Sequence, residues 1–477
     1  MLNSSDRHPA QRTANAVSRR TFLAGSAAVA AISLLATPIA SADDLSTLRR
    51  RLRGTVLLPG DAGFEDARKP WTLTIDQAVR AVVDVADVGD ASALVGYARE
   101  TGTSLSIQPT GHSATPAANG SILVRTRHLD EVRVDPERKI ARVGAGVSWT
   151  QLHSLVAQGG LLALAGSAPG VGITGYTLGG GLSWFSRRYG WAAQSVRAIE
   201  GICADGARFR ATTDSEPDLF WALRGGGGDY GLVTAIEFDL YPAPNMCGGS
   251  LRWPARHAPA VLAAFRETTN TAPEELAVWF NQSHFPGAPP LTGIDVMYLG
   301  EPAAARALLK PFAGIANRIS DTLRPLRFDE IGTITNEPTA PGGGRQRATL
   351  LTTLTDDVIE SFTAVSMTPL INIQIRHLGG ALGRPSDTAA GPIKEPYLAN
   401  LVGRGDTQTA VEAMQSRVAT YLELLKPINS GRTPFTLLAP EQTAAQALPN
   451  DSISRLQTIK ERRDPQRVFR SNYPVTD

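Results

Sequence analysis

The residues best suited to hold a ligand lie in a glycine-rich stretch between Gly166 and Gly190. Six glycines here can adopt positive φ angles and carry no Cβ atom, so a ligand can lie directly against the main chain and accept hydrogen bonds from its N–H groups. These six are Gly170, Gly172, Gly175, Gly179, Gly180 and Gly181. A pyrophosphate would suit such a backbone site. An ordinary glycine-rich surface loop, however, would have the same composition.

Two further stretches favour the ligand site. Upstream, residues 109–113 (PTGHS) follow a strand-like run at 104–107 and place His112 at a strand-to-loop junction. A single histidine beside a glycine is more often a loop or core residue than a cofactor link. It is the strand-to-loop junction and the later glycine-rich stretch that favour His112 as a cofactor link. Downstream, residues 219–228 (LFWALRGGGG) add another glycine run. The combination of three stretches makes a plain surface loop the weaker interpretation.

The elements that must position these residues alternate between short strands and short helices from residue 45 to about residue 241. One helix is expected to be capped by Asp90 and stopped by Gly102, and another to be capped by Ser148 and ended by Gly159-Gly160. A third is expected at 217–223. Strands are predicted at 81–85, 104–107, 121–124, 131–134, 139–143, 198–203 and 232–241. This interleaving indicates an α+β or α/β domain.

The pattern changes after Pro242 and Pro244, which suggests a second domain. Longer helices are predicted at 260–268, 303–313 and 407–425, and a last one at 451–462. Strands at 276–281, 293–299 and 370–376 lie between them, with loops at 335–347 and 379–396. Helices combined with these strands predict an antiparallel sheet covered by helices.

The N-terminus is a processing segment rather than part of the fold. Ser18-Arg19-Arg20-Thr21-Phe22-Leu23 is followed by an apolar run to Leu35 and by Ala40-Ser41-Ala42. This resembles a twin-arginine signal peptide, residues 1–42, with cleavage expected after Ala42. The alternative is a membrane anchor, for which the run is short and rich in alanine and glycine. The twin-arginine route carries folded proteins whose cofactor is already bound, so the signal itself points to a cofactor.

Composition excludes several other classes of function. Residues 1–42 contain four arginines and one aspartate, so the remainder has 43 basic and 44 acidic side chains and a net charge of −1. Such a chain attracts neither nucleic acid nor an anionic membrane. The seven histidines show no metal-ligand spacing, so no metal is expected. The two cysteines, Cys203 and Cys247, are too few for a disulfide framework, although a single bridge stays open.

Taken together, these stretches resemble the FAD-linked oxidases of the vanillyl-alcohol-oxidase fold, with a PCMH-type FAD-binding domain, and within them the berberine-bridge-enzyme-like branch. The resemblance covers about residues 50–245 and about the last twenty-five residues. It implies that His112 carries FAD covalently through the 8α-methyl group of the isoalloxazine. It also implies that Gly170 to Gly175 cradle the ribityl and pyrophosphate groups, and that the tail Asp464 to Asn472 returns to the flavin domain.

The resemblance also implies a domain plan and a set of cofactor contacts. The fold class is α+β, with a two-subdomain FAD-binding domain at 43–245 and a substrate-binding domain with a helix-covered antiparallel sheet at 246–430. Residues 431–477 would form a C-terminal segment that returns to the FAD domain. The predicted cofactor-binding residues are Thr110, Gly111, His112, Ser113, Gly170, Val171, Gly172, Thr174, Gly175, Tyr176, Gly180, Gly181, Val233 and Asn472.

Some positions depart from the family pattern. Ala168 stands where bicovalent members have a cysteine, so FAD is expected to be mono-covalent, with no thioether link. Tyr176 stands where many members have a histidine. Residues 433–437 contain no Tyr-x-Asn pair, so the family's usual base is not matched. Val171 follows the pattern, because a small residue there is associated with oxygen reaching flavin C4a, which favours an oxidase over a dehydrogenase.

Candidate substrate residues come from the strand predicted at 370–376. Asn372, Gln374 and Arg376 alternate with three isoleucines, so one face of the strand is polar. This face either lines the pocket below the roof of the flavin site or belongs to a solvated edge strand. Tyr298 and His377 are further candidates for a base, although each is more often structural. The catalytic candidates are Tyr298, Gln374 and Arg376, and the Arg187-Arg188 pair is expected to be solvated or to face a phosphate.

We therefore expect an exported, periplasmic or extracellular, FAD-dependent oxidase that takes hydride from a C–H bond next to a hydroxyl or amine and passes electrons to oxygen, giving hydrogen peroxide. Its partners would be a small-molecule substrate, molecular oxygen and the twin-arginine export machinery. A dehydrogenase with another electron acceptor and a catalytically silent flavin-binding protein stay open. A nicotinamide enzyme fits less well, because Arg187, Arg188 and Gln194 follow the glycine run where an acidic residue is needed.

Overall fold

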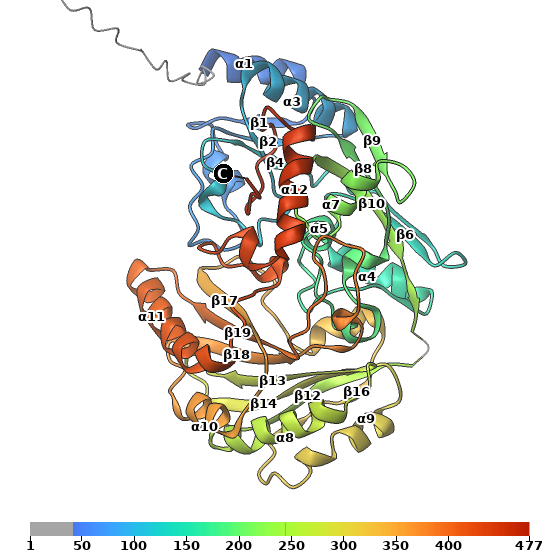
Figure 1. Ribbon diagram of the computed structural model, residues 1–477. Helices are drawn as coiled ribbons and strands as arrows, with labels where there is room; N and C mark the ends of the chain where they lie inside the picture. The colour runs from blue at the N-terminus through green and yellow to red at the C-terminus, as the bar shows by residue number, and fades with distance from the viewer. Residues whose placement is uncertain (1–41, 244, 477) are drawn as a thin grey trace, which may run out of the picture. The chain divides into compact units, whose positions relative to one another are not determined.

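The computed structural model describes residues 42–243 and 245–476, so the predicted twin-arginine motif and the apolar run after it lie outside the described residues. Three large β-sheets, of four, five and eight strands, organise the described chain, and helices pack against them (Figure 1). Two of the sheets are antiparallel throughout and the third is mixed. This confirms the predicted α+β class.

The four-stranded sheet holds the loop that carries His112. Its order is β1-β2-β4-β3, and β2, β4 and β3 run parallel to one another. The strands are β1 (Thr55–Leu57), β2 (Ala81–Asp84), β3 (Leu105–Ile107) and β4 (Ile122–Arg125). The accompanying helices are α1 (Ala42–Arg51), α2 (Phe64–Arg68) and α3 (Val88–Thr101). Gly102 ends α3 with φ of 67°, as predicted.

The start of α3 differs from the sequence prediction. Asp87, not Asp90, is the N-cap residue, and its carboxylate accepts a hydrogen bond from the N–H of Asp90. Asp90 lies in the first turn, where its buried carboxylate accepts hydrogen bonds from the backbone N–H groups of Arg53, Gly54 and Ala86. The prediction was wrong because a tertiary contact, not the helix end, uses this carboxylate.

The five-stranded sheet has the order β5-β6-β10-β8-β9 and supports the glycine-rich stretch. Its strands are β5 (Val132–Asp135), β6 (Ile140–Gly144), β8 (Val196–Ile202), β9 (Arg208–Ala211) and β10 (Leu232–Asp239). The accompanying helices are α4 (Trp149–Gln158), α5 (Ile173–Leu178), α6 (Ser186–Tyr189) and α7 (Pro217–Leu223). A short pair, β7 (Leu161–Leu162) and β11 (Tyr241–Pro242), lies beside it. Ser148 caps α4, as predicted.

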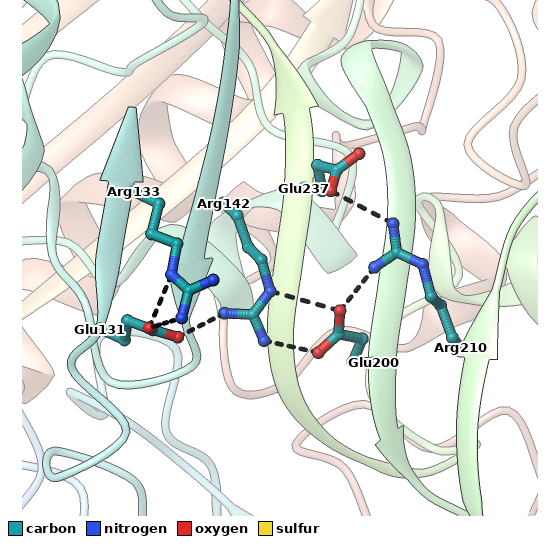
Figure 2. A network of polar contacts seen from close by, with 6 residues as sticks. All are labelled: Glu131, Arg133, Arg142, Glu200, Arg210 and Glu237. Carbon is teal, nitrogen blue, oxygen red and sulfur yellow. Dashed lines mark hydrogen bonds and ion pairs between the residues drawn. The ribbon is translucent and has the colours of Figure 1, made fainter. Parts of the chain in front are cut away.

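One face of this sheet carries a network of ion pairs that involves all five of its strands and Glu131, the residue preceding β5 (Figure 2). Arg142 is at its centre, with Nη2 2.6 Å from Glu200 and Nη1 2.7 Å from Glu131. Arg210 extends the network from Glu200 to Glu237. The hydrogen bond from Arg142 is the largest cause that lowers the pKa of Glu200 below its usual value.

Replacing Arg142 by glutamine is expected to lower the free energy of unfolding by about 1 kcal/mol at neutral pH, because two carboxylates lose a partner in a partly exposed network. The pKa of Glu200 is lowered in the folded state, so this contribution is fully present above its ordinary value of 4.5 and is lost as the pH falls below it. Urea unfolding at neutral and acidic pH would measure the difference. Arg138→Gln, an exposed arginine in the turn between β5 and β6, is the control; an equal effect would contradict the prediction.

The eight-stranded sheet is antiparallel with the order β15-β12-β14-β13-β18-β19-β17, and β16 pairs with β12. Its strands are β12 (Cys247–Pro254), β13 (Leu276–Ser283), β14 (Leu291–Tyr298), β15 (Ser320–Asp321), β16 (Arg324–Pro325), β17 (Gly344–Leu351), β18 (Leu370–His377) and β19 (Tyr397–Arg404). Strand β17 takes up the end of the predicted 335–347 loop, so that loop boundary was wrong. Strand β18 is central, which rules out the solvated edge strand considered for Gln374 and Arg376.

Helices cover one face of this sheet (Figure 1). They are α8 (Ala258–Thr271), α9 (Pro302–Leu308), α10 (Asp356–Ala364) and α11 (Gln408–Leu425). One stripe of α11, formed by Val411, Met414, Tyr421 and Leu425, is buried in this core. The opposite face of the sheet packs Ala277, Trp279 and Met297 into the core of the five-stranded sheet. The strand alternation therefore separates a helix-facing side from a side that faces the glycine-rich stretch.

The chain returns to the first sheet after α12 (Asn450–Arg463). Phe469 forms a parallel bridge with Leu105 of β3, and the N–H of Leu105 donates to Val468 O at 2.7 Å. The buried Lys460 Nζ holds this tail in place by donating hydrogen bonds to Asp229 O, Phe469 O and Asp464 Oδ2. Asn472 is thereby placed beside the loop that follows β3.

The glycine run after α7 is a packing junction. Gly225 and Gly227 have φ of 97° and 87°, which favours glycine. A Cβ atom at Gly227 would lie 2.9 Å from the Phe435 ring, and one at Gly226 would lie 2.7 Å from Leu456. The run therefore lets two distant segments, the 433–437 stretch and α12, approach the main chain closely.

Cys203 and Cys247 are both free thiols, so the bridge left open by the sequence is not formed. Burial raises the pKa of Cys247 to about 11. Over residues 42–243 and 245–476, no helix combines the length and the apolar composition required to cross a membrane.

Candidate cofactor site

The His112 loop is shaped by a glycine that no other residue can replace without strain. Gly111 has φ of 73°, and a Cβ atom there would lie 3.0 Å from Pro70 Cα. The Trp71 N–H donates to Gly111 O at 3.2 Å, so the segment containing Pro70 and Trp71 lies directly on the histidine loop. The Trp71 ring stacks on the His112 ring with a centroid distance of 4.2 Å and an interplanar angle of 18°. Sequence reasoning did not select Trp71, which lies about forty residues before the histidine.

The environment of His112 favours a neutral imidazole. Burial lowers its pKa to about 4, so the ring is uncharged at neutral pH. Its Nδ1 atom lies 2.8 Å from Thr110 Oγ1, within hydrogen-bond distance. A neutral imidazole keeps a nitrogen lone pair, which is the form that acts as a nucleophile. The ring is therefore held by a hydroxyl in its plane and an indole on its face.

The glycine-rich loop lies against the histidine loop, as a common site requires. A Cβ atom at Gly172 would lie 3.5 Å from Pro109 Cβ and from Thr110 Cγ2, and one at Gly170 would lie 3.8 Å from Trp71 Cη2. The start of α5 is held by the Ile173 N–H, which donates to Val147 O at 2.9 Å. The structure thus brings together residues about sixty positions apart in the sequence.

Two observations at α5 fit a large polar cofactor such as FAD. Thr174 Oγ1 is buried and has no hydrogen-bond partner in the protein. The adjacent Gly175 is exposed, and no atom lies within 4 Å of the position of its Cβ. An unpaired buried hydroxyl beside open backbone is costly unless a ligand supplies the missing partner. The donor set, a neutral histidine with a glycine cradle, suits FAD.

The other predicted cofactor residues are placed in different surroundings. Gly180 and Gly181 are buried, and Cβ atoms there would lie 3.2 Å from Trp191 and 2.6 Å from Tyr176. Tyr176 donates its hydroxyl to Leu164 O at 2.9 Å, and burial raises its pKa. These three residues lie close to other protein groups, so a cofactor contact by them stays a prediction.

The remaining predicted cofactor-binding residues are Asn472, Ser113, Val171 and Val233. Asn472 Oδ1 accepts a hydrogen bond from Gln108 Nε2 at 2.9 Å, which places the C-terminal tail at the end of β3. Ser113 is exposed and Val171 is half-buried, whereas Val233 is buried in β10. Asn472 is therefore placed beside the His112 loop, whereas Val233 lies deeper in the core.

The polar face of β18 points toward the glycine-rich stretch. Gln374 and Arg376 are buried, and Arg376 donates from Nε and Nη2 to Gln374 Oε1 at 3.0 and 2.7 Å. The Arg376 guanidinium lies 3.9 Å from the centroid of the Trp279 ring. Burial lowers the pKa of Arg376 to about 10, so it stays charged at neutral pH. These two residues can bind and orient a ligand, but neither can accept a proton.

Tyr298, the third catalytic candidate, is not brought to this face. It packs with the helix-facing core of the sheet, whereas its neighbour Met297 packs on the opposite side. Strand alternation separates it from Gln374 and Arg376. His377 is also directed away: its Nε2 lies 2.8 Å from Arg187 Nη1, and burial beside this cation lowers its pKa to about 2.

Arg187 corrects another prediction, because it is neither solvated nor aimed at a phosphate. It is buried in α6 and donates to the backbone carbonyls of Ala272, Pro273, Leu276 and Leu378. Arg188 is half-exposed and lies near Glu274 and Glu275. The two arginines differ in burial because only Arg187 points toward the eight-stranded sheet and the end of α8.

Comparison with known proteins shows which kind of domain the chain contains. Residues 79–212 match a family described as an FAD binding domain. The (R)-6-hydroxynicotine oxidase of Paenarthrobacter nicotinovorans is 30% identical over 309 residues, 63% of this chain and 64% of that protein. This chain spans 64%, 38% and 43% of the length of the first three curated relatives, the latter two being fungal FAD-dependent monooxygenases.

Two solved structures share the fold. BBE-like 1 of Physcomitrella patens has a TM-score of 0.80 and 20% identity, covering 91% of this chain and 99% of its own. The 6-hydroxy-D-nicotine oxidase of Arthrobacter nicotinovorans has a TM-score of 0.78 and 23% identity, covering 92% of this chain and 99% of its own. The chain thus has an FAD-binding domain on the fold of the PCMH-type, berberine-bridge-enzyme-like FAD-linked oxidases, which confirms the resemblance seen in the sequence.

Proposed function

We propose that this chain is an exported FAD-dependent oxidase whose flavin is linked covalently to His112. The observation that carries the proposal is the neutral imidazole of His112, held between Thr110 and Trp71 directly beside the glycine cradle. Linkage would join an imidazole nitrogen of His112 to the 8α carbon in place of one methyl hydrogen, and dioxygen would take up the two electrons and two protons released, as hydrogen peroxide. The likeness to an oxidase over 63% of the chain supports this reading.

When bound, FAD would accept a hydride from a substrate C–H bond next to a hydroxyl or amine and return two electrons to dioxygen as hydrogen peroxide. The chain itself binds and orients the substrate between the cofactor cradle and the β18 face. Gln374 offers a neutral amide and Arg376 a cation to that space. The substrate proton is therefore taken by a group other than these two, and Tyr298 lies on the wrong face for it.

Export by the twin-arginine route is consistent with a covalent cofactor. The route carries folded proteins, and a flavin attached before export cannot dissociate afterwards. The Arg19-Arg20 motif and the following apolar run are the features that support this part of the proposal.

The proposal is tested on the exported, purified protein. We expect yellow flavin fluorescence to stay with the polypeptide after acid denaturation and on a denaturing gel. Anaerobic addition of amines, alcohols and sugars should bleach the flavin with one of these classes, and admission of air should restore its colour within seconds with formation of peroxide. Slow recovery in air would instead indicate a dehydrogenase. A protein that contains no flavin would overturn the proposal.

Replacing Trp71 by alanine is expected to slow covalent attachment about two- to tenfold, which is the rate equivalent of one lost aromatic pair. The reason is that the imidazole would lose the ring that fixes its plane. Incubation of flavin-free protein with FAD, followed by gel fluorescence against time, measures the rate. Trp71→Phe should be closer to the parent. The control is Trp221→Ala, which removes a ring that packs on Arg455 instead of on His112. If Trp71→Ala attached flavin as fast as the parent protein, the prediction would be contradicted.

A further inference from the structure

The guanidinium of Arg376 belongs to a stack that joins the eight-stranded sheet to the glycine-rich stretch. Trp184 stacks on Trp279 with a centroid distance of 3.6 Å and an interplanar angle of 12°. Arg376 Cζ lies 3.9 Å from the Trp279 ring, and it must lie on the other face because Trp184 fills the first. A small cavity is lined by residues that include these three. The stack therefore borders a small cavity between the eight-stranded sheet and residues 182–187 at the end of the glycine-rich stretch.

Arg376 has no carboxylate partner among the described residues. Its two hydrogen bonds go to one neutral atom, Gln374 Oε1. Asp295, the buried carboxylate on the same face, is engaged by Arg252 and by Asn281, whose Nδ2 lies 2.6 Å away. The charge of Glu337 raises the pKa of Arg376, although the two side chains do not form an ion pair. Arg376 is thus a buried cation whose charge is not matched by an adjacent anion.

A buried cation without a partner is expensive. Desolvation of an ion costs several kcal/mol, and hydrogen bonds to one amide oxygen do not return this. Packing alone would be served better by an apolar side chain of similar volume. The structure nevertheless holds the guanidinium in one plane through Gln374 and Trp279. Trp184 Nε1 is buried without a hydrogen-bond partner, so the stack also contains an unsatisfied donor. A buried cation without an adjacent anion, in one stack with an unsatisfied donor, indicates a preorganised site for an acceptor.

We infer that Arg376 binds an anionic group of the substrate, such as a carboxylate, and that Gln374 and Trp279 hold the guanidinium in place to receive it. This inference rests on the proposed function and narrows it to substrates that carry a negative charge beside the oxidised hydroxyl or amine. A planar guanidinium with fixed orientation suits a carboxylate, because its N–H groups donate to both oxygens.

Calorimetric titration of the flavin-loaded protein with benzoate and with its neutral analogue benzamide tests the inference. We expect benzoate to bind at least about tenfold more tightly than benzamide, as for a hydrogen bond to a charged group. Arg376→Met should weaken benzoate binding by about tenfold to a hundredfold, and Arg376→Lys by less. Arg324→Met, an exposed arginine of the same sheet, should match the parent.

The possible outcomes separate this inference from the proposed function. Circular dichroism and thermal unfolding show whether Arg376→Met is folded, and the comparison of benzoate with benzamide on the parent needs no variant. Equal binding of the two probes, or unchanged benzoate binding in folded Arg376→Met, would overturn the anion site. A preparation without flavin would refute the proposed oxidase, whereas Arg376-dependent benzoate binding to that same preparation would still support the site.

Discussion

Replacing His112 by alanine is expected to abolish covalent flavin completely, so that no fluorescence stays with the denatured polypeptide. The reason is chemical: a methyl group offers no lone pair, and Thr110 and Trp71 would surround an empty position. FAD held without a covalent bond would be released by acid and found in the supernatant. Gel fluorescence combined with absorbance of that supernatant measures both fractions.

His153 provides a closely matched control. It is also buried, and burial lowers its pKa to about 4, as it does for His112. Its ring, however, packs against Phe328 and Trp149 in the core of the five-stranded sheet. His153→Phe should therefore keep the covalent flavin in full. Fluorescence that persists in His112→Ala would show that another residue forms the link and would refute the assignment of His112.

Replacing Arg187 by methionine is expected to lower the free energy of unfolding by about 3–5 kcal/mol, because several acceptors lose their donor and each buried acceptor left unsatisfied costs about 1–3 kcal/mol. Four backbone carbonyls and the His377 ring lose their donor at once. These acceptors lie at the end of α8, at the start of β13 and after β18, so the loss loosens the eight-stranded sheet from the glycine-rich stretch. Arg187→Lys keeps the charge but has fewer donors, so its free energy of unfolding should lie between those of the parent and of Arg187→Met.

Arg188, the next residue, is the natural control. It is half-exposed, with ion pairs of 3.8 and 3.4 Å to Glu274 and Glu275. Such pairs contribute about 0–1 kcal/mol, so Arg188→Met should be nearly neutral. Urea unfolding followed by circular dichroism measures each variant. Equal effects of Arg187→Met and Arg188→Met would mean that the buried hydrogen bonds contribute little, contrary to the geometry.

Much of the secondary structure follows from local sequence. The helix after Ser148 and the stop at Gly102 were predicted because caps and left-handed glycines act within one turn of the chain. The Asp90 cap failed for the opposite reason, since its carboxylate is used by the backbone near Gly54, thirty-six residues away. Local signals could not distinguish Asp87 from Asp90, because both are acceptors near the helix start.

The candidate site was predicted in part. His112 and the Gly170 loop were found because a glycine of unusual geometry and a reactive side chain leave a local signature. Trp71 left none, since only tertiary packing puts its ring on the imidazole. Tyr298 was selected by type alone, and the pairing of β14 in the sheet turns it to the helix side.

The sequence by itself determined the order of strands and helices, the glycines of the candidate cofactor site, the family resemblance and the polar alternation along β18. These features depend on residues within a few positions of one another, so they can be read from the sequence. Only the tertiary structure decided which face of β18 points toward the glycine-rich stretch, why Arg187 is buried while Arg188 is not, and that Arg376 has no carboxylate partner. Burial and charge pairing depend on residues far apart in sequence, and only folding brings those residues together.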